Sequence, residues 1–306
     1  MNLNIEIDEY LKKKHYRQIN SVLLWKDEEI LAKRYYNGFD ENSKNVIKSV
    51  AKSIMSIGIG IALDKGLLKS LDEPIYHFIP EFNEDRDSFH KLITIRHLLT
   101  MTSGIYFHGG VHYHCPMLTQ MRSSGNWISH IADCAVTNMP GTKYNYKEWD
   151  VILLAKLMDN VCGDMFDFID DNLYKPLDII SDHWYKSPCG VYYSVANGDE
   201  GESERTSNLT AIDMLKIGQL FLNGGTFHGR RIISESYIHQ AVAPSIYNSG
   251  YGLLWWRGEN WYGCRGYGGQ SITVVPDKNA VLVTQATPTA RGMGYDDVIW
   301  YCLDLV

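Results

Sequence analysis

Strand-like sequence occurs at both ends of this chain, while helical periodicity fills its middle. The β-rich runs 21–25 and 29–36 flank a short charged break, which predicts a hairpin. Further strands are predicted near the C-terminus, at 252–256, 261–265, 271–275 and 280–285. The arrangement implies an α+β lobe built from both termini, with a mostly helical lobe inserted between them.

Apolar residues recur with helical spacing in several segments. The clearest is 49–65, in which Val50, Ile54 and Ile57 lie on one face. Other helices are predicted at 5–18, 127–136, 149–161, 208–223 and 295–305, with Thr94 as a helix cap.

The order of these elements also predicts the domain organisation. We expect residues 1–72 and 203–306 to form the lobe that holds the sheet, and residues 73–202 to form the helical lobe. A cleft between two lobes is a common place for an active site, so we expect the site there.

Composition limits the classes of partner. A chain of 306 residues with 45% hydrophobic and 21% charged residues has an ordinary globular composition. Its formal net charge of -7 gives no general attraction to phosphate backbones or anionic lipid, so neither nucleic acid nor membrane is an expected partner. The N-terminal segment lacks an apolar signal core, which predicts a cytoplasmic location; a leader trimmed from the chain is the alternative.

Ser49-Val-Ala-Lys52 opens the predicted helix at 49–65. Residues three apart on a helix have Cβ atoms about 5–6 Å apart, so this hydroxyl and amine share a face. A serine is a weak nucleophile until a base takes its proton, and a lysine is such a base only when its pKa is lowered. The same four residues also fit a serine cap followed by a surface lysine.

Several downstream segments accompany this motif. They include Ile93-Thr-Ile-Arg-His-Leu-Leu-Thr-Met-Thr-Ser-Gly104, Pro140-Gly-Thr-Lys-Tyr-Asn-Tyr146 and Gly266-Tyr-Gly-Gly-Gln270. Together they resemble the serine β-lactamase and penicillin-binding protein superfamily, in the class C-like branch that also contains carboxylesterases and 6-aminohexanoate-dimer hydrolases. The resemblance implies a β-lactamase/transpeptidase-like fold, with an antiparallel sheet flanked by terminal helices, and catalysis through an acyl-enzyme.

Of the family's first two motifs, one is intact in this sequence and the other is altered. S-x-x-K falls on Ser49 and Lys52 unchanged, whereas Y-x-N falls on Tyr146 to Glu148, where a glutamate replaces the asparagine. The resemblance makes Tyr146 the group that carries the proton from Ser49 to the leaving group; a core tyrosine is the alternative. We expect Glu148 to lie near the substrate, where its charge disfavours the carboxylate of a β-lactam.

The third motif, K-T-G or H-x-G in relatives, falls on Tyr267, Gly268 and Gly269, so its first position carries no cation. The glycines suit an edge strand that a substrate approaches closely, or else a hairpin corner. The family pattern makes the backbone N–H of Gln270 the second oxyanion donor, opposite that of Ser49. We expect the three motif residues to contact the substrate.

His108, His112 and His114 lie close together in the sequence. Their spacing matches neither a zinc finger nor H-E-x-x-H, and a glycine pair between them indicates a loop. We therefore expect no metal and no organic cofactor; the role of this loop stays open.

These features predict a serine hydrolase that cleaves a small ester or amide as its small-molecule substrate. A true β-lactamase or D-alanyl carboxypeptidase is one alternative, and a catalytically silent, ligand-binding member of the family is another. The sequence leaves open which of Lys52 and Tyr146 is the general base, the natural substrate and the oligomeric state.

Overall fold

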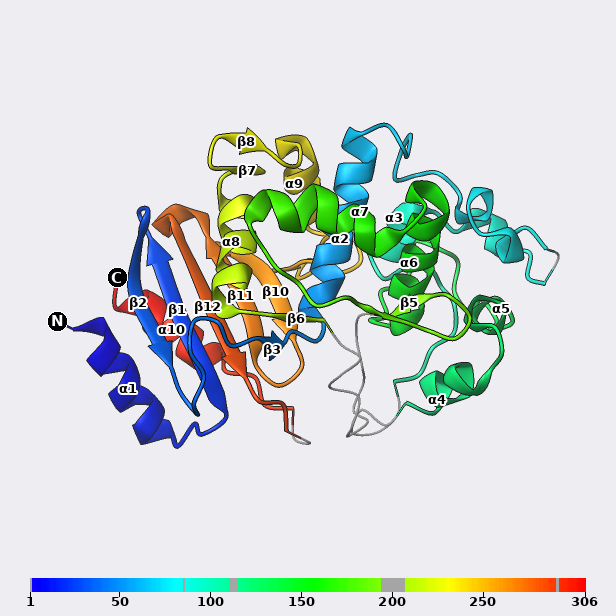
Figure 1. Cartoon of the computed structure of the whole chain (residues 1–306). Helices are drawn as coiled ribbons and strands as arrows, with labels where there is room; N and C mark the ends of the chain where they lie inside the picture. Colours follow the sequence, from blue (N-terminus) through cyan, green and yellow to red (C-terminus); the bar gives the residue numbers. More distant parts are fainter. Residues whose placement is uncertain (1, 85, 110–114, 194–206, 290–291) are drawn as a thin grey trace.

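The computed structural model describes residues 2–84, 86–109, 115–193, 207–289 and 292–306 (Figure 1). Its helices are α1 (Leu3–Lys14), α2 (Val50–Asp64), α3 (Ile95–Leu99), α4 (Pro116–Ser123), α5 (Trp127–Ala132), α6 (Glu148–Cys162), α7 (Met165–Ile169), α8 (Ala211–Leu222), α9 (Glu235–Val242) and α10 (Asp296–Asp304). Its strands are β1 (Ile19–Lys26), β2 (Glu29–Tyr35), β3 (Asn45–Val46), β4 (Tyr185–Lys186), β5 (Tyr192–Tyr193), β6 (Asn208–Leu209), β7 (Thr226–Phe227), β8 (Arg230–Arg231), β9 (Trp256–Arg257), β10 (Tyr262–Gly266), β11 (Gln270–Val275) and β12 (Ala280–Ala286).

The main sheet takes strands from both ends of the chain, in the order β2-β1-β12-β11-β10-β9 (Figure 1). Every neighbouring pair is antiparallel, and β1 pairs with β12 with Leu24 opposite Leu282. The predicted α+β class, with an antiparallel sheet built from both termini, is therefore confirmed.

Both faces of the central strands are buried because helices cover each face. Successive side chains of a strand point to opposite faces, and in β1 Leu23 joins one hydrophobic core while Val22 and Leu24 join the other. The second core is closed by α1 and α10, whose residues include Ile7 and Val298 (Figure 1). The terminal helices thus flank the sheet, as predicted.

Helix α2 stands between the sheet and the helical part of the chain (Figure 1). Every residue from Val50 to Ala62 is buried, so the helix has no solvent face. A helix surrounded by protein needs apolar residues all round, and glycines let its neighbours approach. A Cβ atom at Gly60 would lie only 2.5 Å from the ring of Tyr237. Lys52 is the one charged residue in this buried stretch.

Between the strands of the two termini, the described residues from 95 to 177 are mainly helical, and α6 is the longest of their helices. The division of the chain into lobes near residues 72 and 202 stays a prediction. Of the helices in the described ranges, none has the length and apolar character that crossing a bilayer requires.

Several predicted elements differ from the structure. The helices predicted at 5–18 and 127–136 end early, at Lys14 and at Ala132. The helix predicted from residue 208 begins later, because Thr210 caps α8 through Asp213, and Asn208 and Leu209 form β6 and pair with β3. The strand predicted at 252–256 is wrong except at its last residue. Leu254 has a φ of 62°, and the N–H of Gly252 donates to the carbonyl of Trp255, so this buried run folds into a turn.

The packing of α8 on the sheet generates a stability prediction. A Cβ atom at Gly218 would lie 2.4 Å from Cγ1 of Val281 on β12. We expect Gly218→Ala to lower the free energy of unfolding by about 1–2 kcal/mol, because overpacking a stiff β-branched neighbour outweighs the better helix propensity of alanine. Urea denaturation measures this difference.

Two further variants control that measurement. A Cβ atom at Gly125 would meet no other atom within 4 Å, so Gly125→Ala is expected to leave stability nearly unchanged. Val281→Ala added to Gly218→Ala removes the nearest of the atoms that the new methyl meets, while Cγ2 of Ile272 stays 2.9 Å away. The loss of stability in the double variant is expected to be smaller than the sum of the losses in the two single variants. Fully additive effects would show that the close approach has no energetic consequence.

Candidate active site

Ser49 occupies the N-cap position of α2, but its side chain makes no capping hydrogen bond. Thr94, Asn126 and Thr210 begin other helices of this chain, and each accepts a backbone N–H in the usual way. The Ser49 hydroxyl oxygen instead accepts a hydrogen bond from Nζ of Lys52 at 3.1 Å. The motif is therefore not a serine cap followed by a surface lysine.

The ammonium of Lys52 lies between Ser49 and Glu148. Nζ donates to Oε1 of Glu148 at 2.8 Å and to Oε2 at 2.9 Å. Lys52 is 1% exposed and Glu148 is 4% exposed. An ammonium has three hydrogens, and here three acceptors surround it: the Ser49 hydroxyl and both carboxylate oxygens.

This pairing sets the charge of Lys52. Burial alone would lower the pKa of Lys52, but the carboxylate of Glu148, helped by Tyr146, outweighs burial and holds that pKa above its ordinary value. A lysine that takes a proton from serine near neutral pH needs the opposite shift. The geometry therefore favours a charged Lys52 in the free protein.

Tyr146 lies beside the same pair and lines the cleft. Its ring centroid is 5.1 Å from Nζ of Lys52, and its ring stacks on Trp256 with the centroids 5.8 Å apart. Tyr251 meets it edge to face at 6.2 Å. Burial raises the pKa of the Tyr146 phenol above its ordinary value, and the opposing effect of the Lys52 ammonium does not cancel this rise.

A cleft of about 430 Å³ opens at Ser49 and Tyr146. Apart from these two, its lining residues are Trp256, Arg265, Gly266, Tyr267, Gly268, Gly269, Gln270, Ser271, Thr284, Gly292, Gly294, Tyr295, Asp296 and Ile299. Three of the predicted substrate contacts, Tyr267 to Gly269, thus share one cleft with the serine. Glu148 lies behind Lys52, and its contact in the structure is with that residue rather than with the cleft.

The predicted edge strand at the third motif is wrong, because Tyr267, Gly268 and Gly269 form the turn between β10 and β11. Gly268 and Gly269 have φ values of 81° and 100°, which side chains rarely adopt. The hydroxyl of Tyr267 donates to the carbonyl of Thr289 at 2.7 Å. The turn is thus anchored to the segment that follows β12.

Gln270 joins the sheet to the segment that precedes the serine. Its Oε1 accepts a hydrogen bond from Nδ2 of Asn45 at 2.8 Å, and its Nε2 donates to the carbonyl of Ala286 at 2.6 Å. A Cβ atom at Gly266 would lie 2.4 Å from the carbonyl oxygen of Ile47. These contacts bring the end of β10 against the start of α2. That the N–H of Gln270 binds an oxyanion stays a prediction.

A second buried group of polar side chains lies beside the Lys52–Glu148 pair. Nζ of Lys147 donates to the Ser103 hydroxyl at 3.0 Å and to the carbonyl of Ile105 at 3.1 Å. The Ser103 hydroxyl donates to Oδ1 of Asp150 at 2.5 Å, while Oδ2 has no hydrogen-bond partner within the described part of the chain. Burial raises the pKa of Asp150 to about 6.

Sequence reasoning missed two charged residues of the cleft. Nε of Arg265 lies 3.2 Å from Oδ1 of Asp296, and the Arg265 guanidinium lies over the ring of Trp261. The signal was a single arginine within the apolar run that precedes the third motif. Arg265 places a cation in the cleft, two residues before Tyr267. This cation is already paired with the carboxylate of Asp296.

The predicted histidine loop is only partly described. His112 and His114 lie outside the described residues, whereas the backbone N–H of His108 approaches the sulfur of Met117 at 3.2 Å. Among the residues that the structure does describe, no group of three or more His, Cys, Asp or Glu side chains is arranged to hold a metal ion.

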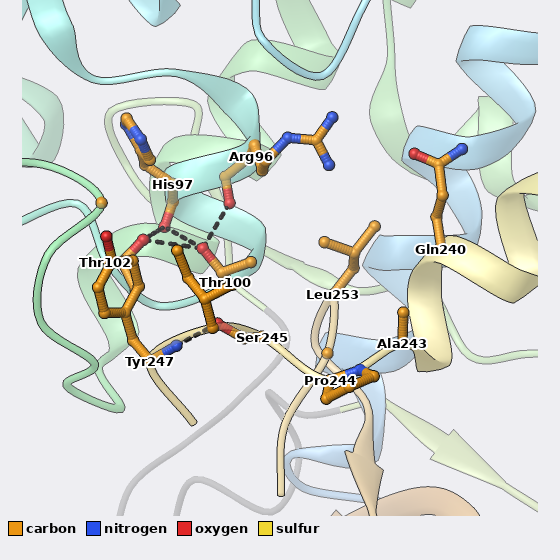
Figure 2. A pocket seen from close by; sticks show the side chains of 13 residues that line it. Arg96, His97, Thr100, Thr102, Gln240, Ala243, Pro244, Ser245, Tyr247 and Leu253 are labelled. Carbon is orange, nitrogen blue, oxygen red and sulfur yellow. Dashed lines mark hydrogen bonds between the residues drawn. The ribbon is translucent and has the colours of Figure 1, made fainter. Parts of the chain in front are cut away.

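Another cavity, of about 490 Å³, lies between α3 and the segment 243–253 (Figure 2). The hydroxyl of Thr100 donates to the carbonyl of Arg96 and pairs with the hydroxyl of Thr102. Leu253 forms part of the wall of this cavity. The next residue, Leu254, accepts a hydrogen bond at its carbonyl from the hydroxyl of Ser53 in α2. The cavity shares none of its lining residues with the cleft at Ser49.

The state of Asp150 generates a testable pH dependence. With a native pKa near 6 and an unfolded value near 3.9, this carboxyl holds a proton in the native state that the unfolded chain has lost. Stability from this group is therefore present at pH 4 and falls as pH rises towards 6. We expect Asp150→Asn, measured by urea denaturation, to gain roughly 2–3 kcal/mol relative to wild type between pH 4 and pH 8. Parallel stability profiles would contradict it.

Comparison with known proteins identifies the family of this chain. The family model described as Beta-lactamase matches residues 7–297. The chain is 23% identical to the 6-aminohexanoate-dimer hydrolase of Paenarthrobacter ureafaciens over 291 residues. These aligned residues cover 86% of this chain and 71% of that protein.

Solved structures show the same fold. A candidate β-lactamase from Bacteroides dorei has a TM-score of 0.79 and 17% identity, over 99% of this chain and 97% of that one. A penicillin-binding protein from Bacillus halodurans has a TM-score of 0.76 and 18% identity, over 98% and 100% of the two chains. With a family model matched along almost its whole length, this chain belongs to the Beta-lactamase family, within the superfamily of serine β-lactamases and penicillin-binding proteins.

Proposed function

We propose that this protein is a serine hydrolase that cleaves a small ester or amide through an acyl-enzyme. The observation that carries the proposal is the Ser49 hydroxyl, which is withdrawn from helix capping and bonded to a buried lysine at the mouth of a cleft. That bond turns the hydroxyl oxygen towards a buried ammonium rather than into its own helix, which supports a role for the hydroxyl in chemistry.

In the proposed reaction, Ser49 attacks the substrate carbonyl and its hydroxyl proton passes to the pair formed by Lys52 and Tyr146. The oxyanion is held at the N-terminus of α2 by the N–H of Ser49, with the N–H of Gln270 as the second donor. The same proton then goes to the leaving group, and water releases the acyl group. Each of these groups lies on the cleft or directly behind it.

The size of the cleft supports a small substrate. A volume of about 430 Å³ is at the lower end of the usual range for ligand pockets, about 300–1,000 Å³. A curated relative is named as a hydrolase of an aminohexanoate dimer, which is an amide. The structural neighbour named as a penicillin-binding protein keeps a β-lactam or D-alanyl substrate as the second candidate.

The nucleophile assignment is tested by Ser49→Ala. We expect this variant to fold and to lose covalent labelling by a fluorescent alkyl phosphonate, because it removes the hydroxyl that Lys52 Nζ bonds at the cleft. Ser53→Ala is a matched control, since Ser53 lies one turn further along α2 and donates to the carbonyl of Leu254. Labelling that persists at the wild-type rate in Ser49→Ala would mean another nucleophile.

The substrate class is tested at Tyr267. Its hydroxyl is committed to the carbonyl of Thr289, so it offers no charge to a β-lactam carboxylate. We expect wild type to cleave p-nitrophenyl acetate with a higher kcat/KM than benzylpenicillin. In Tyr267→Lys, the ratio of kcat/KM for benzylpenicillin to that for the ester should rise about tenfold, since a charge-assisted hydrogen bond is worth about 1.5–3 kcal/mol.

The uncharged ester is the internal control, because a new cation two residues from Arg265 should change its hydrolysis little. Wild-type hydrolysis of benzylpenicillin at a kcat/KM equal to or above that of the ester would favour the β-lactamase alternative.

A further inference from the structure

The partner of Lys52 is a carboxylate where the second motif of relatives has an amide, and the two have opposite effects on a buried amine. An amide can accept a hydrogen bond but carries no charge, so burial would lower the pKa of such a lysine unopposed. A carboxylate that receives two of the three ammonium hydrogens stabilises the charged form. In this chain both Oε atoms of Glu148 lie within 2.9 Å of Lys52 Nζ.

The surroundings of the pair leave Glu148 as the group that sets its charge. Tyr146 faces Lys52 from the segment before α6. Tyr251, in the turn before β9, contacts the ring of Tyr146. Both are phenols and are neutral until alkaline pH. Lys147 follows Tyr146 in the chain but turns towards Ser103 and Ile105, where its Nζ donates both of its described hydrogen bonds.

We infer that Glu148 is a positioning residue that keeps Lys52 as an ammonium throughout the working pH range, so that the phenol oxygen of Tyr146 is the group that receives the serine proton. This inference rests on the proposed function. Glu148 is then not a contact with substrate. It is the residue that, by keeping Lys52 charged, leaves Tyr146 to accept the proton of Ser49.

Charge and atoms balance in this step. The Oγ–H bond of Ser49 breaks, its proton forms a bond with the Tyr146 phenolate oxygen, and Oγ bonds to the substrate carbonyl carbon, whose oxygen takes the electron pair. Lys52 keeps its three protons and its hydrogen bond to Oγ. When the tetrahedral intermediate collapses, the Tyr146 proton goes to the departing oxygen or nitrogen, and the phenolate is restored.

The consequence is an enzyme that works best at alkaline pH. The Lys52 charge is matched by the Glu148 carboxylate, so the ammonium cannot strongly favour a phenolate beside it, and the pKa of Tyr146 stays above its ordinary value. The fraction of Tyr146 ready to accept a proton then rises tenfold for each pH unit below that pKa.

The test compares the pH dependence of kcat/KM for p-nitrophenyl acetate in wild type and Glu148→Gln. Wild-type kcat/KM, corrected for spontaneous hydrolysis, should rise about tenfold per pH unit between pH 7 and pH 9. In Glu148→Gln the whole acid limb should move to lower pH by at least one unit. A profile that falls in height without moving would assign Glu148 a merely structural part and overturn the inference.

Asp150→Asn is the matched control, because it neutralises a second buried carboxylate of α6 that bonds Ser103 rather than Lys52. Its kcat/KM profile should keep the wild-type pH dependence. An equal displacement in both variants would show a general charge effect of the helix and would overturn the specific role of Glu148.

A second measurement does not depend on how well Glu148→Gln folds. In wild-type protein with ¹⁵N-labelled lysines, the Nζ resonance of Lys52, identified by its loss in Lys52→Met, should show an ammonium at pH 9. A neutral amine at that pH would overturn the inference. Failure of the proposed function is seen separately, as hydrolysis that survives in Ser49→Ala; a silent Ser49→Ala with an unmoved Glu148→Gln profile overturns this inference alone.

Discussion

The buried ion pair between Lys52 and Glu148 is the interaction around which the site is arranged. Placing two charges in a protein interior costs several kcal/mol per ion, and their attraction repays this only with good geometry. Here the geometry is met by two short bonds to one carboxylate and a third to Ser49. Since α2 brings the lysine and α6 brings the glutamate, the pair also fixes how the first turns of these two helices meet.

That constraint explains why the nucleophile stands where it does. With Lys52 held by Glu148, its remaining hydrogen points at the Ser49 oxygen, so the hydroxyl is oriented by the lysine and not by its own helix. The first N–H groups of α2 are occupied, because those of Val50, Ala51 and Lys52 donate to the backbone carbonyls of residues 47, 48 and 49. At this end of the helix the proposed reaction therefore relies on the N–H of Ser49 itself.

The rest of the cleft depends on the sheet. Gln270 is bonded to Asn45, four residues before the serine, and Gly266 leaves room for the carbonyl of Ile47. These contacts hold the end of β10 and the start of β11 against the segment that precedes α2. The turn at Tyr267 is anchored to Thr289, so the far wall of the cleft is positioned from the segment after β12 and not by the motif alone.

Features that depend on neighbours in the sequence were predictable from the residues alone. The hairpin of β1 and β2, the helix at 49–65 and the shared face of Ser49 and Lys52 follow from local periodicity. The position of strand-like runs at both termini also indicated the α+β class. Tyr146 was located by resemblance of its surrounding segment rather than by any physical signal of its own.

Tertiary structure decided what those local patterns left open. The sequence shows a glutamate at position 148, but its contact with Lys52 joins two residues that are 96 positions apart and lie on different helices. Likewise, the run 252–256 has the composition of a strand, yet packing around Leu254 bends it into a turn, and the glycines at 268 and 269 adopt positive φ. Periodicity indicates which side chains are buried. The partner that each buried side chain contacts is decided only by how segments distant in the sequence pack together.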